Sequence, residues 1–224
     1  MLKQYREIRD AAIARTAGST GAGQLFLGES LKPNRRVTSR MEHLACFVPG
    51  MLALEWHMGG QEQEYVHGKS NALELAEEYM ATCMMMYELT PTGLSAEAYD
   101  MPMSRVERIN PQKGFKFSLL RPETIESAFV LWRVTKKQEY RDFGWKVFNS
   151  IEKWARLPGE GGYTAIHDVL FETDAGKSNR LDRMDSFFLS ETLKYLYLLF
   201  SPDSVLPLDE YVLNTEAHPL PIWE

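Results

Sequence analysis

The apolar positions of this chain recur with helical spacing over six stretches, which are separated by segments rich in glycine, proline and polar residues. The stretches predicted to be helical are 2–17, 43–57, 70–88, 122–136, 139–156 and 185–200. Start signals support two of them, with Ser70 and Asn71 before the third and Pro122 opening the fourth. Inside the second, Pro49-Gly50 indicates a kink or a helix start.

Between and after these helices the pattern is less regular. A few short stretches, such as 114–118 and 163–169, have β-like character. The tail over residues 201–224 is expected to be irregular, because Pro219 and Pro221 interrupt it. The helices come in pairs, joined alternately by short turns and long loops, as in a helical solenoid or a closed α/α toroid. The predicted fold class is therefore all-α.

Composition and charge narrow the classes of function. The chain has 224 residues, 44% of them hydrophobic, within the range of one large globular domain. Its net charge is −6, and the sequence contains no block of like charges. Both features argue against a nucleic-acid-binding surface. No segment approaches the roughly 18 apolar residues of a membrane span, since the nearest, 187–200, contains Glu191 and Lys194. Residues 1–15 form a charged helical pattern without the apolar core of an export signal.

A histidine and two cysteines are the first candidates for chemistry. His43 opens the apolar run HLACFVPG, where it is either a hydrogen-bonded core residue or, by its spacing from Cys46, a metal ligand. The chain has no second Cys/His pair, which argues against a zinc site. Cys46 and Cys83 are the only cysteines, and their number alone is compatible with buried free thiols or with a single disulfide.

The segment LLRPETIES carries two acids and an arginine. Glu123 and Glu126 are three residues apart on a predicted helix and share a face, with Arg121 just before them. Acids in a first turn can simply complement the helix dipole. A carboxylate pair beside an arginine also serves acid–base chemistry or the binding of hydroxyl groups. The residues alone leave both interpretations open.

The helix MDSFFLSETLKYLYLLF is apolar nearly all round, which predicts that it is buried. Glu191 in its middle is costly to bury unless it is paired or hydrogen-bonded, and Lys194 could satisfy it. Phe187 lies four residues before Glu191, on the same face. An aromatic ring beside a carboxylate suits a sugar, since the ring stacks on its apolar face and the acid binds its hydroxyls.

The segment NTEAHP near the C-terminus combines three kinds of polar side chain. Asn214 and Thr215 could close a turn, and Glu216 could pair with a cationic side chain. Alternatively, Thr215 offers a hydroxyl and a carbonyl oxygen to a hard cation. His218 follows, and we interpret it as a residue that stabilises the turn.

Taken in order, five segments resemble the C-terminal half of a class I α-1,2-mannosidase of glycoside hydrolase family 47. They are HLACFVPG, LLRPETIESAFVLWRVT, GGYTAI, MDSFFLSETLKYLYLLF and NTEAHP. The resemblance covers nearly the whole chain and includes ATCMMMYELTPTGLSAEA between the first two. Several long motifs in one order are far more specific than a single short pattern.

The resemblance implies a fold and an activity. The fold is an (α/α)7 barrel, of which residues 1–224 are expected to form about half, as the C-terminal part of one catalytic domain whose N-terminal half is absent. The activity is the hydrolysis of terminal α-1,2-linked mannose from high-mannose N-glycans, with inversion and with a bound Ca²⁺. The resemblance also implies an endoplasmic reticulum, Golgi or secreted location, with the signal or anchor outside this chain.

The resemblance assigns roles to individual residues. Glu123 of RPET corresponds to the general base, while the general acid and a further aspartate are expected in the absent half. The substrate contacts that it implies are His43, Arg121, Glu126, Phe187, Glu191 and Glu216. Thr215 corresponds to the residue that gives Ca²⁺ its hydroxyl and carbonyl oxygens. Cys46 and Cys83 match the positions of a family disulfide, which favours an oxidising compartment.

Without its general acid, this chain is expected to release no mannose by itself. Two other functions stay open. One is a calcium-dependent glycan-binding module that does not cleave, and the other is a relative acting in glycoprotein degradation. GGYTAI and NTEAHPLPI occur together in the chain, which favours the processing enzymes.

Overall fold

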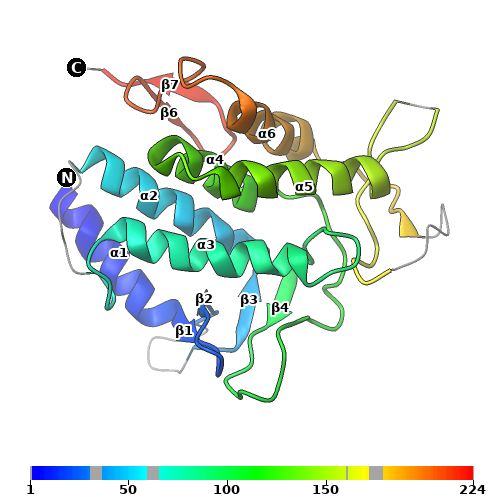
Figure 1. Cartoon of the computed structure of the whole chain (residues 1–224), viewed down its shortest axis with the longest axis horizontal. Coiled ribbons are helices and arrows are strands. Elements are labelled where there is room, and N and C mark those ends of the chain that lie inside the picture. The colour runs from blue at the N-terminus through cyan, green and yellow to red at the C-terminus, as the bar shows by residue number, and fades with distance from the viewer. Residues whose placement is uncertain (1, 31–36, 60–65, 160, 172–178, 224) are drawn as a thin grey trace.

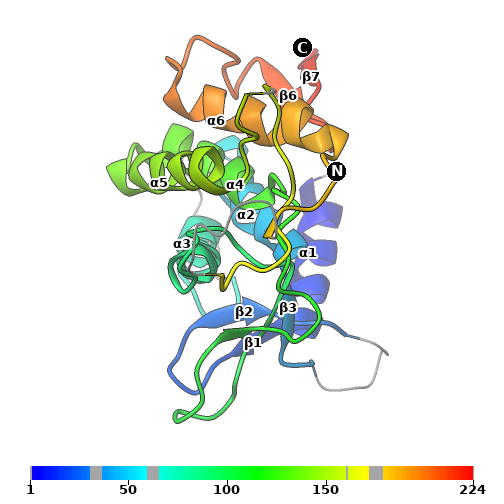
Figure 2. The same ribbon diagram turned by 90° about the vertical axis from the view of Figure 1, so that its right-hand side faces the viewer.

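The structure, a computed structural model, describes residues 2–30, 37–59, 66–159, 161–171 and 179–223. Its helices are α1 (Leu2–Thr16), η1 (His43–Phe47), α2 (Val48–Met58), α3 (Ala72–Glu88), α4 (Glu123–Thr135), α5 (Gln138–Trp154), η3 (Phe188–Thr192) and α6 (Leu193–Phe200). Figures 1 and 2 show α6 uppermost, α4 and α5 below it, and α2 and α3 below these, with α1 at the height of α2 and α3. Within the described residues, no helix is long and apolar enough to cross a membrane.

Short antiparallel strands complete the fold. They are β1 (Ala17–Ser19) with β2 (Leu25–Leu27), β3 (Arg40–Glu42) with β4 (Ala98–Asp100) and β5 (Asn110–Pro111), and β6 (Tyr211–Leu213) with β7 (Pro219–Pro221). The β-like stretches expected at 114–118 and 163–169 contribute single bridges only, such as the bridge between Ser118 and Ile166. The helical predictions are confirmed to within a few residues at each end.

The tail differs from the expectation of an irregular segment, because β6 and β7 form a hairpin across NTEAHP. Pro219 pairs with Leu213 and Pro221 with Tyr211, so the prolines occupy alternate positions of β7. In an antiparallel pair, alternate N–H groups point away from the partner strand, and a proline there removes no ladder bond. The two prolines therefore do not interrupt this hairpin.

Helix α4 forms the centre of the molecule, packing against α2, α5, α6 and η1. Most of its residues are buried, and they include the polar side chains of Thr124, Ser127 and Arg133. The chain enters α4 through Leu120, whose φ of 60° lies in the left-handed region. The Leu120 carbonyl accepts a hydrogen bond from Thr192 Oγ1 at 2.7 Å, which ties η3 to the start of α4.

Close contact between α2 and α4 aligns the N-terminal ends of η1 and α4. The Ser127 hydroxyl accepts a hydrogen bond from Gly50 N at 2.8 Å and donates to the Cys46 carbonyl at 2.5 Å. A Cβ on Gly50 would lie 3.0 Å from the Ser127 Cα, so a side chain there would push the helices apart. The expected bond between Cys46 and Cys83 is formed and joins η1 to α3.

Candidate active site

The first pair of the site is His43 with Glu123. His43 begins η1, Glu123 begins α4, and the His43 Nδ1 lies 3.1 Å from the Glu123 Oε2. Burial alone would raise the pKa of the Glu123 carboxyl, but the hydrogen bond with His43 and the nearby Arg121 charge hold that pKa below its ordinary value. Glu123 is therefore a half-buried carboxylate kept in its ionised form, as a general base requires.

Glu126 lies one turn further along α4, and its pKa is shifted in the opposite direction to that of Glu123. Burial raises its pKa from 4.5 to about 7, a hydrogen bond with Tyr195 opposes the shift, and the charges of Glu123 and Glu191 add to it. The Tyr195 hydroxyl donates to the Glu126 Oε1 at 3.1 Å. Neighbouring carboxyls whose pKa values are pushed apart in this way are typical of sites that handle protons and hydroxyls.

Glu191 is buried in η3, a π-helical turn in which the Leu193 N–H bonds to the Phe188 carbonyl five residues earlier. Burial and then the charges of Glu216 and Glu123 raise the pKa of Glu191 to about 7, against the effect of Lys194. No hydrogen bond or ion pair joins Lys194 to Glu191 in the described structure, and the Lys194 Nζ donates instead to the Ala217 carbonyl at 2.8 Å. Pairing with Lys194 therefore does not account for the carboxylate in this helix.

Arg121 and Phe187 form an aromatic and cationic wall of the site. The Arg121 guanidinium lies 5.4 Å from the centre of the Phe187 ring and 2.5 Å from the Glu97 carboxylate. Glu97 is held in turn by the Leu119 backbone N–H at 3.0 Å. The ion pair fixes the guanidinium, and the guanidinium packs against the ring that we predicted to hold a sugar.

Thr215 and Glu216 lie in the turn between β6 and β7. The Asn214 Oδ1 accepts hydrogen bonds from the backbone N–H groups of Glu216 at 3.0 Å and His218 at 2.9 Å, and Ala217 closes the turn with a φ of 56°. His218 thus contributes to the turn through its backbone. Thr215 and Glu216 are exposed, and the charge of Glu216 reaches the buried Glu191.

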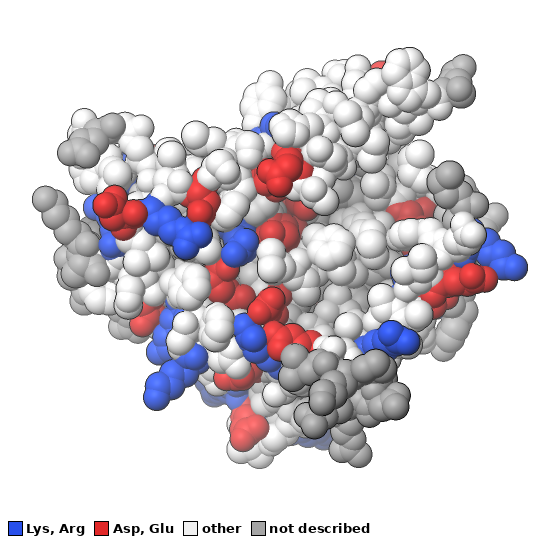
Figure 3. Space-filling view, turned by 180° about the vertical axis from the view of Figure 1, so that it is seen from behind, with Lys and Arg blue, Asp and Glu red and all other residues white. Residues whose placement is uncertain are grey.

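The structure thus brings four predicted carboxylates into one electrostatic cluster: Glu123, Glu126, Glu191 and Glu216. The positive charge of Arg121 favours ionised Glu123, and the positive charge of Lys194 favours ionised Glu191. Acidic side chains also lie along the middle of the face opposite to Figure 1, beside a hollow (Figure 3). A surplus of carboxylates suits a ligand rich in hydroxyl groups, or a cation that shares the site.

Sequence reasoning missed several residues that complete the site, above all Tyr87, Tyr195 and Glu97. Both tyrosines occupy positions of the apolar helical repeat, so the sequence pattern indicates core packing and gives no sign that their hydroxyls bond to site residues. Glu97 follows a loop, and nothing in its spacing connects it to Arg121. The spacing of Tyr195 four residues after Glu191 was the one available signal, since it predicts a shared helical face.

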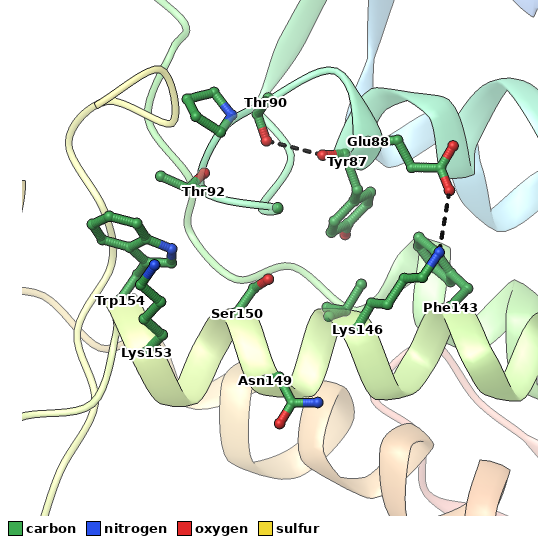
Figure 4. Close-up of a pocket in the computed structure, with 13 residues that line it drawn as sticks. Tyr87, Glu88, Thr90, Thr92, Phe143, Lys146, Asn149, Ser150, Lys153 and Trp154 are labelled. Carbon is green, nitrogen blue, oxygen red and sulfur yellow. Dashed lines mark hydrogen bonds and ion pairs between the residues drawn. The ribbon is translucent and has the colours of Figure 1, made fainter. Parts of the chain in front are cut away.

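A separate cavity of about 550 Å³ lies between the end of α3 and the length of α5 (Figure 4). Tyr87, Thr92, Lys146 and Trp154 are among the residues that line it. It contains none of the residues predicted for the site. Tyr87 nevertheless connects the two regions, because its ring borders the cavity and its hydroxyl bonds to His43.

The raised pKa of Glu126 predicts how stability changes with pH. The folded protein binds a proton at Glu126 more tightly than the unfolded chain does, so stability should fall as pH rises from 4.5 to about 7. Replacing Glu126 with glutamine should flatten this fall. Urea unfolding at successive pH values without added cations measures it, with Glu139→Gln, an exposed position of α5, as the control. Parallel profiles for Glu126→Gln and the wild type would contradict the prediction.

Comparison with known proteins identifies the family of this chain. Residues 1–222 match glycosyl hydrolase family 47. The chain belongs to this family. A mannosyl-oligosaccharide 1,2-alpha-mannosidase of Arabidopsis thaliana is 43% identical over 224 residues, covering 89% of this chain and 35% of the relative. The endoplasmic reticulum mannosyl-oligosaccharide 1,2-alpha-mannosidase of Homo sapiens is 45% identical over 205 residues, covering 88% of this chain and 27% of the relative.

The fold of this family 47 chain also matches a solved structure. An alpha-1,2-mannosidase from Trichoderma reesei superposes with a TM-score of 0.79 and 23% identity, covering 99% of this chain and 47% of the other. The predicted all-α fold, built from paired helices of an α/α barrel, is confirmed. The chain spans about a third of the length of these curated relatives.

Proposed function

We propose that this family 47 chain supplies the general-base side of an active site that hydrolyses terminal α-1,2-linked mannose of high-mannose N-glycans. The observation that carries the proposal is the ionised Glu123, held by His43 at the start of the central helix beside Arg121 and Phe187. The curated relatives bear the names of mannosyl-oligosaccharide 1,2-alpha-mannosidases, which supports the choice of sugar and linkage.

The proposed reaction inverts the anomeric centre. Glu123 removes a proton from the attacking water, while a carboxylic acid on the other side of the sugar protonates the leaving oxygen. Glu126, Glu191 and Glu216 bind the hydroxyls of the mannose, and Phe187 packs against its apolar face. We place the general acid outside these 224 residues, because the chain covers only 47% of the related fold.

We further propose that the site holds Ca²⁺ at Thr215. Within the described residues no protein hydrogen bond occupies the Thr215 hydroxyl or carbonyl, and the nearby carboxylates leave a surplus of negative charge. No group of three or more His, Cys, Asp or Glu side chains in the described parts of the chain forms a metal cage, so the remaining ligands would be waters and sugar hydroxyls. A bound Ca²⁺ would orient those hydroxyls.

We assign the protein to the secretory pathway. The relative from Homo sapiens carries the endoplasmic reticulum in its name, and a disulfide such as the bond between Cys46 and Cys83 persists in oxidising compartments.

Glycan binding by the chain tests the calcium proposal. The 224-residue chain should bind α-1,2-linked oligomannose in a calorimeter without releasing mannose, and a calcium chelator should abolish the binding. Thr215→Ala should weaken the affinity by about tenfold, equivalent to about 1.4 kcal/mol. Ser204→Ala removes an exposed hydroxyl elsewhere and should bind as the wild type does.

The outcomes separate the candidate functions. Binding that is insensitive to the chelator would reject the calcium site. Robust mannose release by the chain alone would reject the assignment of the general acid to another segment. Chelator-sensitive binding, with no release even after the rest of a catalytic domain is supplied, would favour a glycan-binding module.

A further inference from the structure

Three side chains from two helices, α3 and α4, converge on the imidazole of His43. Its Nδ1 lies 3.1 Å from the Glu123 carboxylate, and its Nε2 lies 2.8 Å from the Tyr87 hydroxyl and 3.0 Å from the Thr124 hydroxyl. His43, Tyr87 and Thr124 are all buried, at 3%, 6% and 0% exposure. The imidazole thus has a defined partner on each nitrogen and little access to water.

These partners decide where the imidazole proton lies. A neutral imidazole has one N–H donor and one acceptor nitrogen, whereas a carboxylate only accepts. In the neutral form of His43, Nδ1 therefore carries the proton that is donated to Glu123, and Nε2 accepts a hydrogen bond from a hydroxyl. The Tyr87 and Thr124 hydroxyls both lie within hydrogen-bond distance of Nε2, so either of them can donate to it.

Burial keeps the Tyr87 hydroxyl protonated, so that it can always donate a hydrogen bond. The loss of water around its ring raises the pKa of the phenol well above the ordinary range, outweighing the opposite effect of the Thr124 hydrogen bond. The hydroxyl therefore keeps its proton at every pH at which the folded protein works. Glu123 can lose and regain a proton while its neighbour His43 is held from behind by a group that does not titrate.

The surroundings of Tyr87 fix its ring in place. Tyr87 lies one turn after Cys83 on α3, and Cys83 is bonded to Cys46, three residues after His43. The Phe143 ring packs edge-on against the Tyr87 ring, with centroids 5.2 Å apart. Figure 4 shows Tyr87 reaching from the end of α3 into the wall of the cavity toward α5. The disulfide and the α5 contact together set the distance between the hydroxyl and His43.

We propose that Tyr87 is a positioning residue of the active site: it holds His43 as the Nδ1–H tautomer and so aims that N–H at Glu123. With one Glu123 oxygen occupied by His43, the other is left for the attacking water. This inference rests on the proposed role of Glu123 as the general base. Thr124 supports Tyr87 from the same side of the ring.

Nitrogen NMR of the 224-residue chain tests the tautomer without any need for activity. With ¹⁵N-labelled histidine, His43 should show a protonated Nδ1 and an unprotonated Nε2. Tyr87→Phe should give a mixture of the two neutral tautomers of His43. Adding Thr124→Val removes the second hydroxyl at Nε2 and should increase the share of the Nε2–H tautomer further. His43→Gln identifies the signal.

Tyr79→Phe is the matched control. Tyr79 lies on α3, is fully buried, and its hydroxyl has no hydrogen-bond partner among the described residues. Its replacement should leave the His43 nitrogen signals unchanged. A wild-type His43 that is protonated on Nε2, or a Tyr87→Phe variant indistinguishable from Tyr79→Phe, would overturn the inference.

Activity gives a second readout in a chimera, in which this chain replaces the matched segment of the relative from Homo sapiens. Tyr87→Phe should lower kcat by roughly tenfold with KM unchanged, a loss of the size seen when the outer hydrogen-bond partner of a metal-binding histidine is removed. The acidic limb of the pH profile should move to higher pH, because a poorly aimed N–H stabilises ionised Glu123 less.

If the NMR result holds but Glu123→Gln leaves turnover intact, the proposed function fails and the tautomer assignment stands. If Glu123 is essential and Tyr87→Phe changes neither readout, only the further inference fails.

Discussion

Glu123→Gln is expected to lower mannose release by roughly 10²–10⁴-fold, the usual contribution of a positioned general base. Glutamine retains an oxygen that can accept the hydrogen bond from His43, so the fold and the affinity for the glycan should change little. It cannot take a proton from water, and the loss should therefore appear in kcat. The measurement uses the chimera with the relative from Homo sapiens, which supplies the part of that relative's length that this chain does not match.

Glu139→Gln is the control for this experiment, since it makes the same chemical change at an exposed position in the first turn of α5. Its kcat should equal that of the unmodified chimera. A Glu123→Gln chimera that keeps a tenth or more of the turnover would show that another group acts as the base.

Removal of the disulfide is expected to have the largest effect on stability. The bond between Cys46 and Cys83 closes a loop with a sequence separation of 37, for which the chain-entropy relation gives about 4 kcal/mol. The double variant Cys46→Ala/Cys83→Ala should lose about 2–4 kcal/mol of unfolding free energy, measured by urea denaturation. The loss arises because the unfolded chain gains freedom that the bond removes.

Reduction provides the internal control for this variant. Dithiothreitol should bring the wild type close to the double variant and should leave the double variant unchanged. Equal stability of the oxidised wild type and the double variant would contradict the prediction. The same samples can report on the site, because His43 lies three residues from Cys46 and Tyr87 four from Cys83.

The helices were predictable because helical periodicity depends on local sequence. Asn71 illustrates this, since its side chain accepts a hydrogen bond from the Glu74 N–H at 2.9 Å and caps α3 as expected. The strands were not predictable, because each has two or three residues and its partner can lie far along the chain, as Met41 and Tyr99 do. The hairpin of the tail was hidden by prolines whose register depends on the pairing itself.

The site was predictable in part. The motifs gave Glu123, Arg121 and Phe187, which the structure places together, and the resemblance gave the disulfide that joins η1 to α3. The catalytic role of Glu123, the Ca²⁺ at Thr215 and the assignment of residues 1–224 to one half of a domain stay predictions. The contacts of Tyr87 could not be predicted, because they depend on the packing of three elements.

The π-helical turn η3 has a consequence for how this site tolerates changes of sequence length. Its widened hydrogen bond, from the Leu193 N–H to the Phe188 carbonyl, amounts to one extra residue inserted into an otherwise α-helical segment. Each residue of an α-helix turns the chain by about 100°. Deleting Ser190 would restore a regular α-helix. With α6 kept in place, the deletion would rotate Phe187 away from Arg121. The exposed Leu189 can therefore vary in identity, whereas the number of residues in this turn cannot.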